Sequence, residues 1–293
     1  MRDIEKIKNT IICGDSLEVM KQMPDNCVDL VFCSPPYEDV RTYDIGFKLK
    51  EQDWVDWAVE RYIECVRISR GLVAWVVEGR TKQFKYSATP ILLMADLHRA
   101  GIKLRKPPIF HRVGIPGSGG PDWLRNDYEF IVCASVGKLP WSDNTATGKP
   151  CKYKVGGQLS YRTQDGRRAN ESRYGALNTK RGTKGGGGYT KPKLANPGNV
   201  IKCTVGGGNM GSKLAHENEA PFPESLPEFF VKSFCPPDGI VLDIFSGSGT
   251  VAAVAIKEKR NYIGIDVRQS QIELTRKRIQ EAKDSMGLFK DLK

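Results

Sequence analysis

Two short segments of the sequence bring residues that could do chemistry to the ends of apolar runs. SPPY (34–37) follows the run VDLVFC (28–33), and SGSGT (246–250) follows IVLDIF (240–245). Consecutive prolines stiffen the first loop, and because each lacks an N–H, the loop offers carbonyl acceptors without matching donors. Glycines let the backbone of the second loop approach a ligand closely and adopt conformations closed to other residues. The two loops therefore predict two binding functions.

The SPPY loop has the groups needed to hold an amino group on a flat ring. Ser34 contributes a hydroxyl acceptor, the prolines contribute carbonyl acceptors, and Tyr37 contributes an aromatic face. Two rigid acceptors beside a stacking ring suit the exocyclic amino group of a planar base, because they bind its two hydrogens and leave the nitrogen lone pair free. The alternative is structural: a strand terminated by proline, with a tyrosine that only packs.

The glycine loop and the acid that follows it predict a site for a nucleoside-type cofactor. Asp266 lies in the next apolar run, NYIGIDV (261–267), 17 residues after Gly249. A carboxylate at this position could accept hydrogen bonds from both hydroxyls of a ribose. Gly247, Gly249 and Ala252 also fit the dinucleotide fingerprint GxGxxA, so a dinucleotide stays open on this motif alone. A tight turn with no ligand is the structural alternative.

Together the two loops resemble those of the S-adenosylmethionine-dependent amino-methyltransferases that act on DNA. The catalytic loop comes first and the cofactor loop last, with a basic segment between them, which is similar to the order in the beta group of this family. The resemblance implies that Gly14-Asp15 contacts the cofactor adenine, that HENEAPFP (216–223) contributes to the methionine pocket, and that LRNDYEFIVCAS (124–135) forms a strand beside the target base. The catalytic residues that it implies are Ser34, Pro35, Pro36 and Tyr37. The cofactor-binding residues that it implies are Asp15, Phe222, Pro223, Asp243, Phe245, Ser246, Gly247, Ser248, Gly249, Thr250 and Asp266.

The activity that the resemblance implies is transfer of a methyl group from S-adenosylmethionine to the exocyclic N4 of a cytosine flipped out of DNA. Ser34 resembles the residue that N4-cytosine enzymes have at the first loop position, whereas aspartate or asparagine is more usual in N6-adenine enzymes. Methylation of the N6 of adenine, with the same fold and mechanism, is the alternative. Neither a metal ion nor a covalent intermediate is needed for this transfer.

Four other functions are weighed against this one. Methylation of RNA or of a protein amide uses similar loops, but asparagine usually precedes the prolines there, and Ser34 stands here. The intact motifs disfavour a non-catalytic nucleic-acid-binding module, and an NAD-dependent oxidoreductase leaves SPPY and the basic segment unexplained. Pro150-Cys151 could supply the nucleophile of carbon-5 cytosine methylation, but it lies in a glycine-rich segment and lacks the downstream Glu-Asn-Val of those enzymes.

The elements that must position these residues alternate between strands and helices. Apolar runs predict strands at 10–13, 28–33, 71–77, 109–113, 128–135, 240–245 and 261–267. Helical spacing and capping predict helices after Asp15, at 53–67, at 89–98, at 247–259 and at 268–284. This alternation predicts an α/β fold, a circularly permuted Rossmann-like methyltransferase sheet, mostly parallel, with helices on both faces and a basic glycine-rich insert. Ligands of such sheets bind at the carboxyl ends of the strands, where both loops lie.

The excess positive charge of the chain is concentrated in one segment. The 293 residues carry a net charge of +11, and residues 138–213 contain 15 Lys and Arg against 3 Asp and Glu, with 15 of the 30 glycines. Such a segment on a near-neutral body predicts an appendage that binds a polyanion, although a solvated, flexible loop is the alternative. We expect a catalytic half (1–137), a basic target-recognition insert (138–213) and a cofactor-binding half (214–293). The residues expected to contact DNA are Arg162, Arg167, Arg168, Arg173, Lys180 and Arg181.

The remaining composition bears on location and partners. No run approaches the ~18 apolar residues of a membrane span, and the charged start MRDIEKIKNT lacks the apolar stretch of a secretory signal. The eight cysteines include no CxxC pair and the three histidines have no ligand spacing, so neither a disulfide scaffold nor a metal site is expected. We expect a cytoplasmic protein of a bacterium or phage, a monomer or homodimer that binds DNA and no membrane. A cognate restriction endonuclease is a further expected partner.

Overall fold

The computed structural model of the chain describes residues 3–38, 46–115, 122–150, 161–162, 168–169 and 194–288. The chain divides into two units. The larger unit comprises Met1–Asp143 with Gly198–Lys293, and the smaller unit comprises Asn144–Pro197. Among the helices of the described residues, none is both long enough and apolar enough to cross a membrane.

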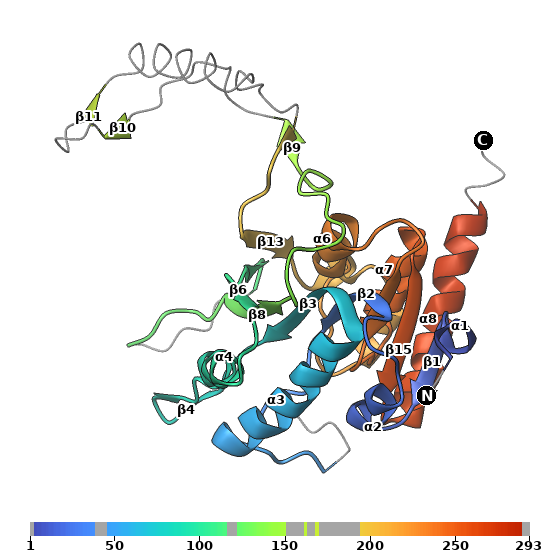
Figure 1. Cartoon of the computed structure of the whole chain (residues 1–293), viewed down its shortest axis with the longest axis horizontal. Helices are drawn as coiled ribbons and strands as arrows, with labels where there is room; N and C mark the ends of the chain where they lie inside the picture. Colours follow the sequence, from blue (N-terminus) through green and yellow to red (C-terminus); the bar gives the residue numbers. More distant parts are fainter. Residues whose placement is uncertain are drawn as a thin grey trace. The chain divides into compact units, whose positions relative to one another are not determined.

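A nine-stranded sheet forms the centre of the larger unit (Figure 1). Its strands are β1 (Thr10–Cys13), β2 (Val28–Cys33), β3 (Ser69–Val77), β6 (Leu104–Arg105), β7 (Ile109–Val113), β8 (Tyr128–Ala134), β13 (Val200–Thr204), β14 (Ile240–Asp243) and β15 (Asn261–Asp266). Eight of them follow the order β1-β15-β14-β2-β3-β8-β7-β13, and β6 pairs with β8. β8 runs antiparallel to β3, β6 and β7, whereas the other neighbours are parallel. The sheet is therefore mostly parallel, as predicted, with one reversed strand.

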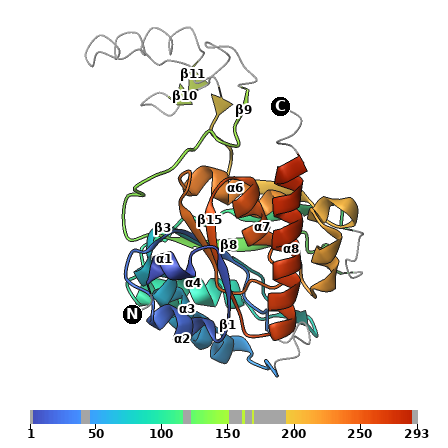
Figure 2. The same ribbon diagram turned by 90° about the vertical axis from the view of Figure 1, so that its right-hand side faces the viewer.

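Helices cover both faces of this sheet. In the larger unit, the described residues form α1 (Ile4–Ile7), α2 (Ser16–Lys21), α3 (Glu51–Ile68), α4 (Thr89–Arg99), α6 (Ser225–Phe234), α7 (Thr250–Lys257) and α8 (Gln269–Leu288), with short 3-10 helices at Gly207–Met210 and Lys213–Glu217. One apolar core joins the sheet to α2, α3 and α4, and the other joins it to α6, α7 and α8 (Figures 1 and 2). This layering confirms the predicted α/β class.

Strand β2 illustrates how one apolar run supplies both cores. All six of its residues are buried. Val31 and Cys33 belong to the core of α2, α3 and α4, whereas Leu30 and Phe32 belong to the core of α6, α7 and α8. Successive side chains of a strand point to opposite faces, so a strand covered on both sides must be apolar throughout.

Most predicted elements form within two residues of their expected ends, but the sequence prediction gives no range for several others, among them α1, β6, α6 and β13. α6 forms from an apolar stretch that is not predicted, and β13 forms from an alternating stretch in a segment expected to be mostly loop with a few short strands. β13 lies inside the expected insert, yet it pairs in parallel with β7, with Val200 opposite Ile109. Residues 198–213 accordingly group with the larger unit. The boundaries of the three expected parts stay a prediction.

The smaller unit contains two short antiparallel strand pairs. They are β9 (Lys149–Pro150) with β12 (Leu194–Ala195), and β10 (Tyr161–Arg162) with β11 (Arg168–Ala169). Of the residues expected to contact DNA, Arg162 and Arg168 have a described backbone, in the second pair. The other four, Arg167, Arg173, Lys180 and Arg181, lie outside the described residues.

The carboxyl ends of the parallel strands meet at one edge of the larger unit's sheet. β1 ends at Cys13, β2 at Cys33, β3 at Val77, β14 at Asp243 and β15 at Asp266. Because β8 is reversed, its first residues reach the same edge, where Phe130 is opposite Val77 and Glu129 is opposite Phe110. The topology therefore brings the loops with predicted chemistry together and adds the start of β8 to them.

Candidate active site

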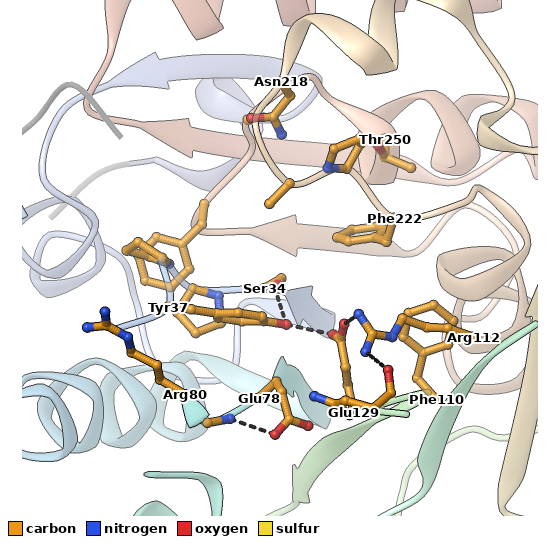
Figure 3. Close-up of a pocket in the computed structure, with 18 of the residues that line it drawn as sticks. Ser34, Tyr37, Glu78, Arg80, Phe110, Arg112, Glu129, Asn218, Phe222 and Thr250 are labelled. Carbon is orange, nitrogen blue, oxygen red and sulfur yellow. Dashed lines mark hydrogen bonds and ion pairs between the residues drawn. The ribbon is translucent and has the colours of Figure 1, made fainter. Parts of the chain in front are cut away.

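A cavity of about 1540 Å³ opens at this edge of the sheet (Figure 3). The four residues of the SPPY loop, Ser34, Pro35, Pro36 and Tyr37, all line it. The expected cofactor-binding residues that line it are Asp15, Phe222, Pro223, Asp243, Phe245, Ser246, Gly247, Ser248, Thr250 and Asp266; Gly249 does not. Two loops that are far apart in the sequence thus share one cavity.

Hydrogen bonds hold the SPPY loop in place. The Ser34 hydroxyl donates to the Val76 carbonyl (3.1 Å) and lies 3.2 Å from the Tyr37 hydroxyl. The Trp54 indole N–H donates to the Pro36 carbonyl (2.8 Å), which ties the loop to α3. When the Ser34 proton is directed to Val76, the Ser34 oxygen keeps lone pairs that can accept hydrogen bonds from a ligand.

A buried carboxylate that is not among the expected site residues holds the Tyr37 ring. The Tyr37 hydroxyl donates to Oε2 of Glu129 (2.7 Å), and Oε1 of Glu129 pairs with Nη1 of Arg112 (3.1 Å) (Figure 3). Glu129 is only 9% exposed, so removing Arg112 would leave its buried charge poorly compensated, whereas removing the Tyr37 hydroxyl would cost it a hydrogen bond. A weak signal exists in the sequence, because Glu129 interrupts the apolar run of its strand.

Glu78, which directly follows β3, places another carboxyl group in the cavity. Its Oε1 accepts hydrogen bonds from the Gly79 N–H (2.9 Å) and the Tyr86 hydroxyl (3.1 Å), and its buried Oε2 has no partner among the described residues. Burial raises the pKa of Glu78 to about 7, and the charge of Glu129 adds to the effect. Glu78 therefore keeps its proton to a much higher pH than an ordinary glutamate.

This raised pKa predicts that the stability of the protein falls as the pH rises. Between the ordinary glutamate pKa of 4.5 and about 7, the folded chain binds more protons at Glu78 than the unfolded chain does. The free energy of unfolding therefore decreases with pH over this window, and the contribution of Glu78 is lost above it. Glu78→Gln removes the part of this pH dependence that is due to Glu78. Between about pH 5 and pH 8 we expect the melting temperature of the wild type to fall about 2–3 °C more than that of the variant, a small difference because water reaches the cavity.

Scanning calorimetry at several pH values measures this difference. Glu60→Gln, which removes an exposed carboxylate from α3, is the matched control. Melting curves of the wild type and Glu78→Gln that shift in parallel with pH would contradict the retained proton.

Asp266 shapes the glycine turn that follows β14. The Gly247 N–H donates to Oδ2 of Asp266 (2.9 Å), and the Arg268 N–H donates to Oδ1 (3.0 Å). Gly247 has a φ of +49°, and a Cβ there would lie 2.7 Å from the Asn218 side chain. Both the backbone conformation and the close contact therefore require glycine.

Gly249 does not line the cavity but allows α7 to begin and to pack closely against α8. It has a φ of +77° at the N-cap of α7, and a Cβ there would lie 2.6 Å from Thr275 of α8. The buried Arg278 of α8 supports the same turn by donating to the hydroxyls of Ser248 (3.1 Å) and Thr250 (2.8 Å). The turn is therefore held by residues of α8 that do not line the cavity.

Two other acids of the cavity have structural partners. Asp243 accepts a hydrogen bond from the Phe245 N–H (3.0 Å), and burial raises its pKa to about 7. Asp15 caps α2 and pairs with Arg61 (2.8 Å), whose guanidinium lies over the Trp57 ring. Burial acts to raise the pKa of Asp15, but the Arg61 guanidinium outweighs it and holds the pKa below its ordinary value. Asp15 is therefore charged in the fold.

The two halves of the cavity suit different ligands. One half combines the Asp266 carboxylate, a glycine turn and the rings of Phe222 and Phe245, which suits a nucleoside with an apolar extension. The other half combines fixed acceptors with the Tyr37 ring, which suits an amino group on a flat base. Within the described ranges, no three His, Cys, Asp or Glu side chains are grouped as metal ligands. The cavity can bring two such organic ligands into contact.

Known proteins share this sequence pattern and fold. A family model described as DNA methylase matches residues 28–277. The DNA adenine methyltransferase YhdJ of Escherichia coli (strain K12) is 25% identical over 277 residues, which cover 93% of this chain and 83% of that protein. The cytosine-N4-specific PvuII DNA methyltransferase superposes with a TM-score of 0.63 at 18% identity, over 94% of this chain and 89% of its own. A Thermus thermophilus protein described as a DNA modification methylase, in complex with S-adenosyl-L-methionine, superposes with a TM-score of 0.55 at 20% identity, over 94% of both chains.

Proposed function

This chain belongs to the DNA methylase family, and on that premise we propose that it transfers a methyl group from S-adenosylmethionine to the exocyclic N4 of a flipped-out cytosine in DNA. The family comprises amino-methyltransferases of the N6 and N4 classes, so the choice of cytosine over adenine is proposed separately from the methyl transfer itself. One observation carries the assignment of the site: the SPPY loop and the glycine turn line the same cavity.

The residues of the cavity fit S-adenosylmethionine. Each carboxylate oxygen of Asp266 has a lone pair besides the one that its backbone partner uses, so Asp266 can accept from the ribose hydroxyls. Gly247 has no side chain to block that approach, and the buried Ser246 hydroxyl has no partner among the described residues. Phe222 and Pro223 provide an apolar wall for the methionine part. When bound, the cofactor supplies an electrophilic methyl group.

The SPPY loop would position the amino nitrogen of the base. Moving the base out of the duplex costs a few kcal/mol, and stacking on the Tyr37 ring offsets roughly 1–3 kcal/mol of that. The Ser34 oxygen and the Pro35 carbonyl would accept the two amino hydrogens, which favours a more tetrahedral nitrogen and disperses the charge that develops there. The Tyr37 hydroxyl donates to Glu129, which fixes the ring and would therefore hold the stacked base in one orientation. Most of the rate acceleration would come from this orientation and from the proximity of the base to the methyl group.

Ser34 is the observation in favour of cytosine. Serine at this loop position resembles the N4-cytosine enzymes, and the PvuII enzyme of the same fold is cytosine-N4-specific. Methylation of the N6 of adenine is the second candidate, because the similar Escherichia coli protein is an adenine methyltransferase. Both amines have a lone pair delocalised into the ring, so the same residues would serve either base.

Incubation with unmethylated DNA tests the proposal directly. Whole-genome-amplified bacterial DNA lacks methylated cytosine and adenine and offers a very large number of short sequences as targets. After reaction with methyl-labelled S-adenosylmethionine, nuclease digestion and mass analysis of the nucleosides identify the product. We expect N4-methylcytosine. N6-methyladenine would overturn only the base, whereas cofactor binding without label in the DNA would overturn the DNA substrate and direct attention to RNA or protein.

We further propose that the basic insert, residues 138–213, recognises the DNA target. Its excess of Lys and Arg over Asp and Glu, 15 against 3, supports this role. Lys and Arg neutralise phosphates, and Arg also reads guanine edges in the major groove. The proposed contacts are Arg162, Arg167, Arg168, Arg173, Lys180 and Arg181.

Replacing both Arg167 and Arg168 by alanine is expected to lower the affinity for DNA and to flatten its salt dependence. Each phosphate contact contributes about 0.9 to the slope of log K against log salt concentration, so two lost contacts reduce the slope by about 2. Fluorescence anisotropy at several salt concentrations measures the slope. The double variant Arg99→Ala and Lys103→Ala, which removes two exposed cations outside the insert, is the control. Unchanged affinity at low salt would assign DNA binding to another part of the chain.

The cellular setting is part of the same proposal. The similar proteins named above come from bacteria, which supports a bacterial or phage-encoded enzyme that acts in the cytoplasm. A cognate restriction endonuclease and a monomeric or homodimeric state stay predictions, and light scattering on the purified protein measures the latter.

A further inference from the structure

A short hairpin next to the cavity has an unusual turn. β4 (Thr81–Lys82) and β5 (Lys85–Tyr86) are joined by Gln83 and Phe84, whose φ angles are +50° and +62°. A two-residue hairpin turn with positive φ at both positions normally contains Asn-Gly, because a Cβ is strained in the left-handed region. A bulky aromatic residue at the second position is therefore unfavourable for the turn itself. Local rules are broken in this way mainly at functional sites.

The Phe84 side chain contributes nothing to the protein core. It is 93% exposed, more than any other large apolar residue that the structure describes. It nevertheless lines the same cavity as Tyr37. A side chain that is almost fully exposed and also lines a cavity lies at the rim, so Phe84 stands where a large ligand would enter.

The base of the hairpin is fixed to the cavity wall. The Arg80 N–H donates to the Ser87 hydroxyl (2.9 Å), and the Ser87 N–H donates to the Arg80 carbonyl (2.9 Å). The Tyr86 ring packs so closely on Gly79 that a Cβ there would lie 2.6 Å from it, and the Tyr86 hydroxyl donates to Glu78 (3.1 Å). These contacts hold the tip at a defined place while the Phe84 ring stays in solvent.

Basic side chains accompany this exposed ring. Lys82 and Lys85 flank the turn, and Arg80 lines the cavity at the start of the hairpin (Figure 3). Lys85 also pairs with Glu51 (2.6 Å), but both side chains are exposed, so water and salt screen the pair. An apolar ring among cations suits a polyanion whose interior is apolar, which describes the base stack of DNA between its phosphates.

We propose that Phe84 enters the base stack of the duplex at the position that the flipped base leaves. The proposal rests on the proposed function, because it requires a DNA base in the cavity. Apolar side chains can insert between base steps and partly unstack them, and an aromatic ring can then stack on the neighbouring bases. Phe84 would therefore stabilise the flipped state of a paired target, whereas a target without a pairing partner needs little such help.

Single-turnover methyl transfer by Phe84→Ala and Phe84→Gly tests the wedge. Sequencing of DNA methylated by the wild type defines the target site. Two duplexes are then compared, one with the target base paired and one with it opposite an abasic position. Both variants are expected to lose about 10- to 100-fold on the paired duplex and less than about threefold on the abasic duplex. Phe84→Gly should be at least as stable as the wild type, because glycine accepts the positive φ without strain.

The controls separate this inference from the proposed function. Ile91→Ala, which trims a half-exposed apolar residue of α4 outside the cavity lining, should leave both rates unchanged. If the wild type methylates no DNA at all, the proposed function fails before Phe84 is compared. If the wild type is active, full activity of both Phe84 variants on the paired duplex, or equal losses on the two duplexes, overturns the wedge alone. Full activity of these variants combined with a loss in Trp123→Ala would assign the wedge to Trp123, another exposed aromatic residue of the cavity lining.

Discussion

Replacing Tyr37 by alanine is expected to lower the rate of methyl transfer about 100-fold and to leave the Kd for S-adenosylmethionine within about twofold of the wild type. The ring belongs to the SPPY loop and is held by Glu129, whereas the Asp266 carboxylate and the glycine turn would bind the cofactor. Without the ring, the flipped base loses its stacking partner and the amino nitrogen is no longer held in one orientation. Single-turnover kinetics measures the rate, and isothermal titration with S-adenosylmethionine measures the Kd.

Tyr37→Phe separates the ring from its hydroxyl. This variant keeps the stacking face but removes the hydrogen bond to Glu129 (2.7 Å) and the contact with Ser34 (3.2 Å). We expect a smaller loss, about three- to tenfold, because the ring is still present but less firmly held. If Tyr37→Ala weakens cofactor binding as much as it slows transfer, the role of Tyr37 in holding the base is wrong.

Much of the fold could be predicted because the central strands are covered on both faces. β2 and β3 are nearly continuous apolar runs, and such runs identify buried parallel strands without any knowledge of their neighbours. β13 escaped prediction because it lies among glycines and lysines, and its two buried residues, Ile201 and Cys203, give only a weak alternation. Its position in the sheet depends on pairing with β7, a contact that local sequence does not reveal.

The candidate site could be predicted where the backbone itself performs the function. Pro35 and Pro36 restrict the backbone conformation of their loop, and Gly247 allows a positive φ in the other. Both effects can be predicted from the residue type alone. Side chains that act through tertiary contacts were not readable. Glu129 reaches Tyr37 only because β8 is reversed in the sheet, and the helix that carries Arg278 looks like any amphipathic helix.

Arg278 is a residue whose role depends on tertiary contacts. It is almost fully buried, and its guanidinium joins Glu224 (3.0 Å) to the hydroxyls of Ser248 and Thr250. A buried cation needs such a set of partners, and these partners come from separate segments of the chain. Burial, which decides whether an arginine is structural or exposed, is a property of the fold and not of the local sequence. For the same reason, the residue types of the basic insert do not distinguish a phosphate contact from a base contact.

Replacing Asp266 by alanine is expected to weaken the binding of S-adenosylmethionine by at least tenfold and up to about 100-fold. A hydrogen bond to a charged group contributes about 1.5–3 kcal/mol, and about 1.36 kcal/mol corresponds to a factor of ten. Two effects add in this variant. The ribose hydroxyls lose their acceptor, and the N–H groups of Gly247 and Arg268 lose the carboxylate that orients the turn. Titration calorimetry measures the affinity, and the melting temperature reports any damage to the fold.

Asp266→Asn distinguishes these two effects. The amide oxygen can still accept one of the two backbone hydrogen bonds, so the turn keeps part of its support, while the negative charge is removed. We expect an affinity between those of the wild type and Asp266→Ala, with a melting temperature close to that of the wild type.

Glu273→Ala, which removes an exposed carboxylate of α8, is the matched control and should bind the cofactor normally. Wild-type affinity in Asp266→Ala would mean that the ribose lies elsewhere and that Asp266 only supports the turn.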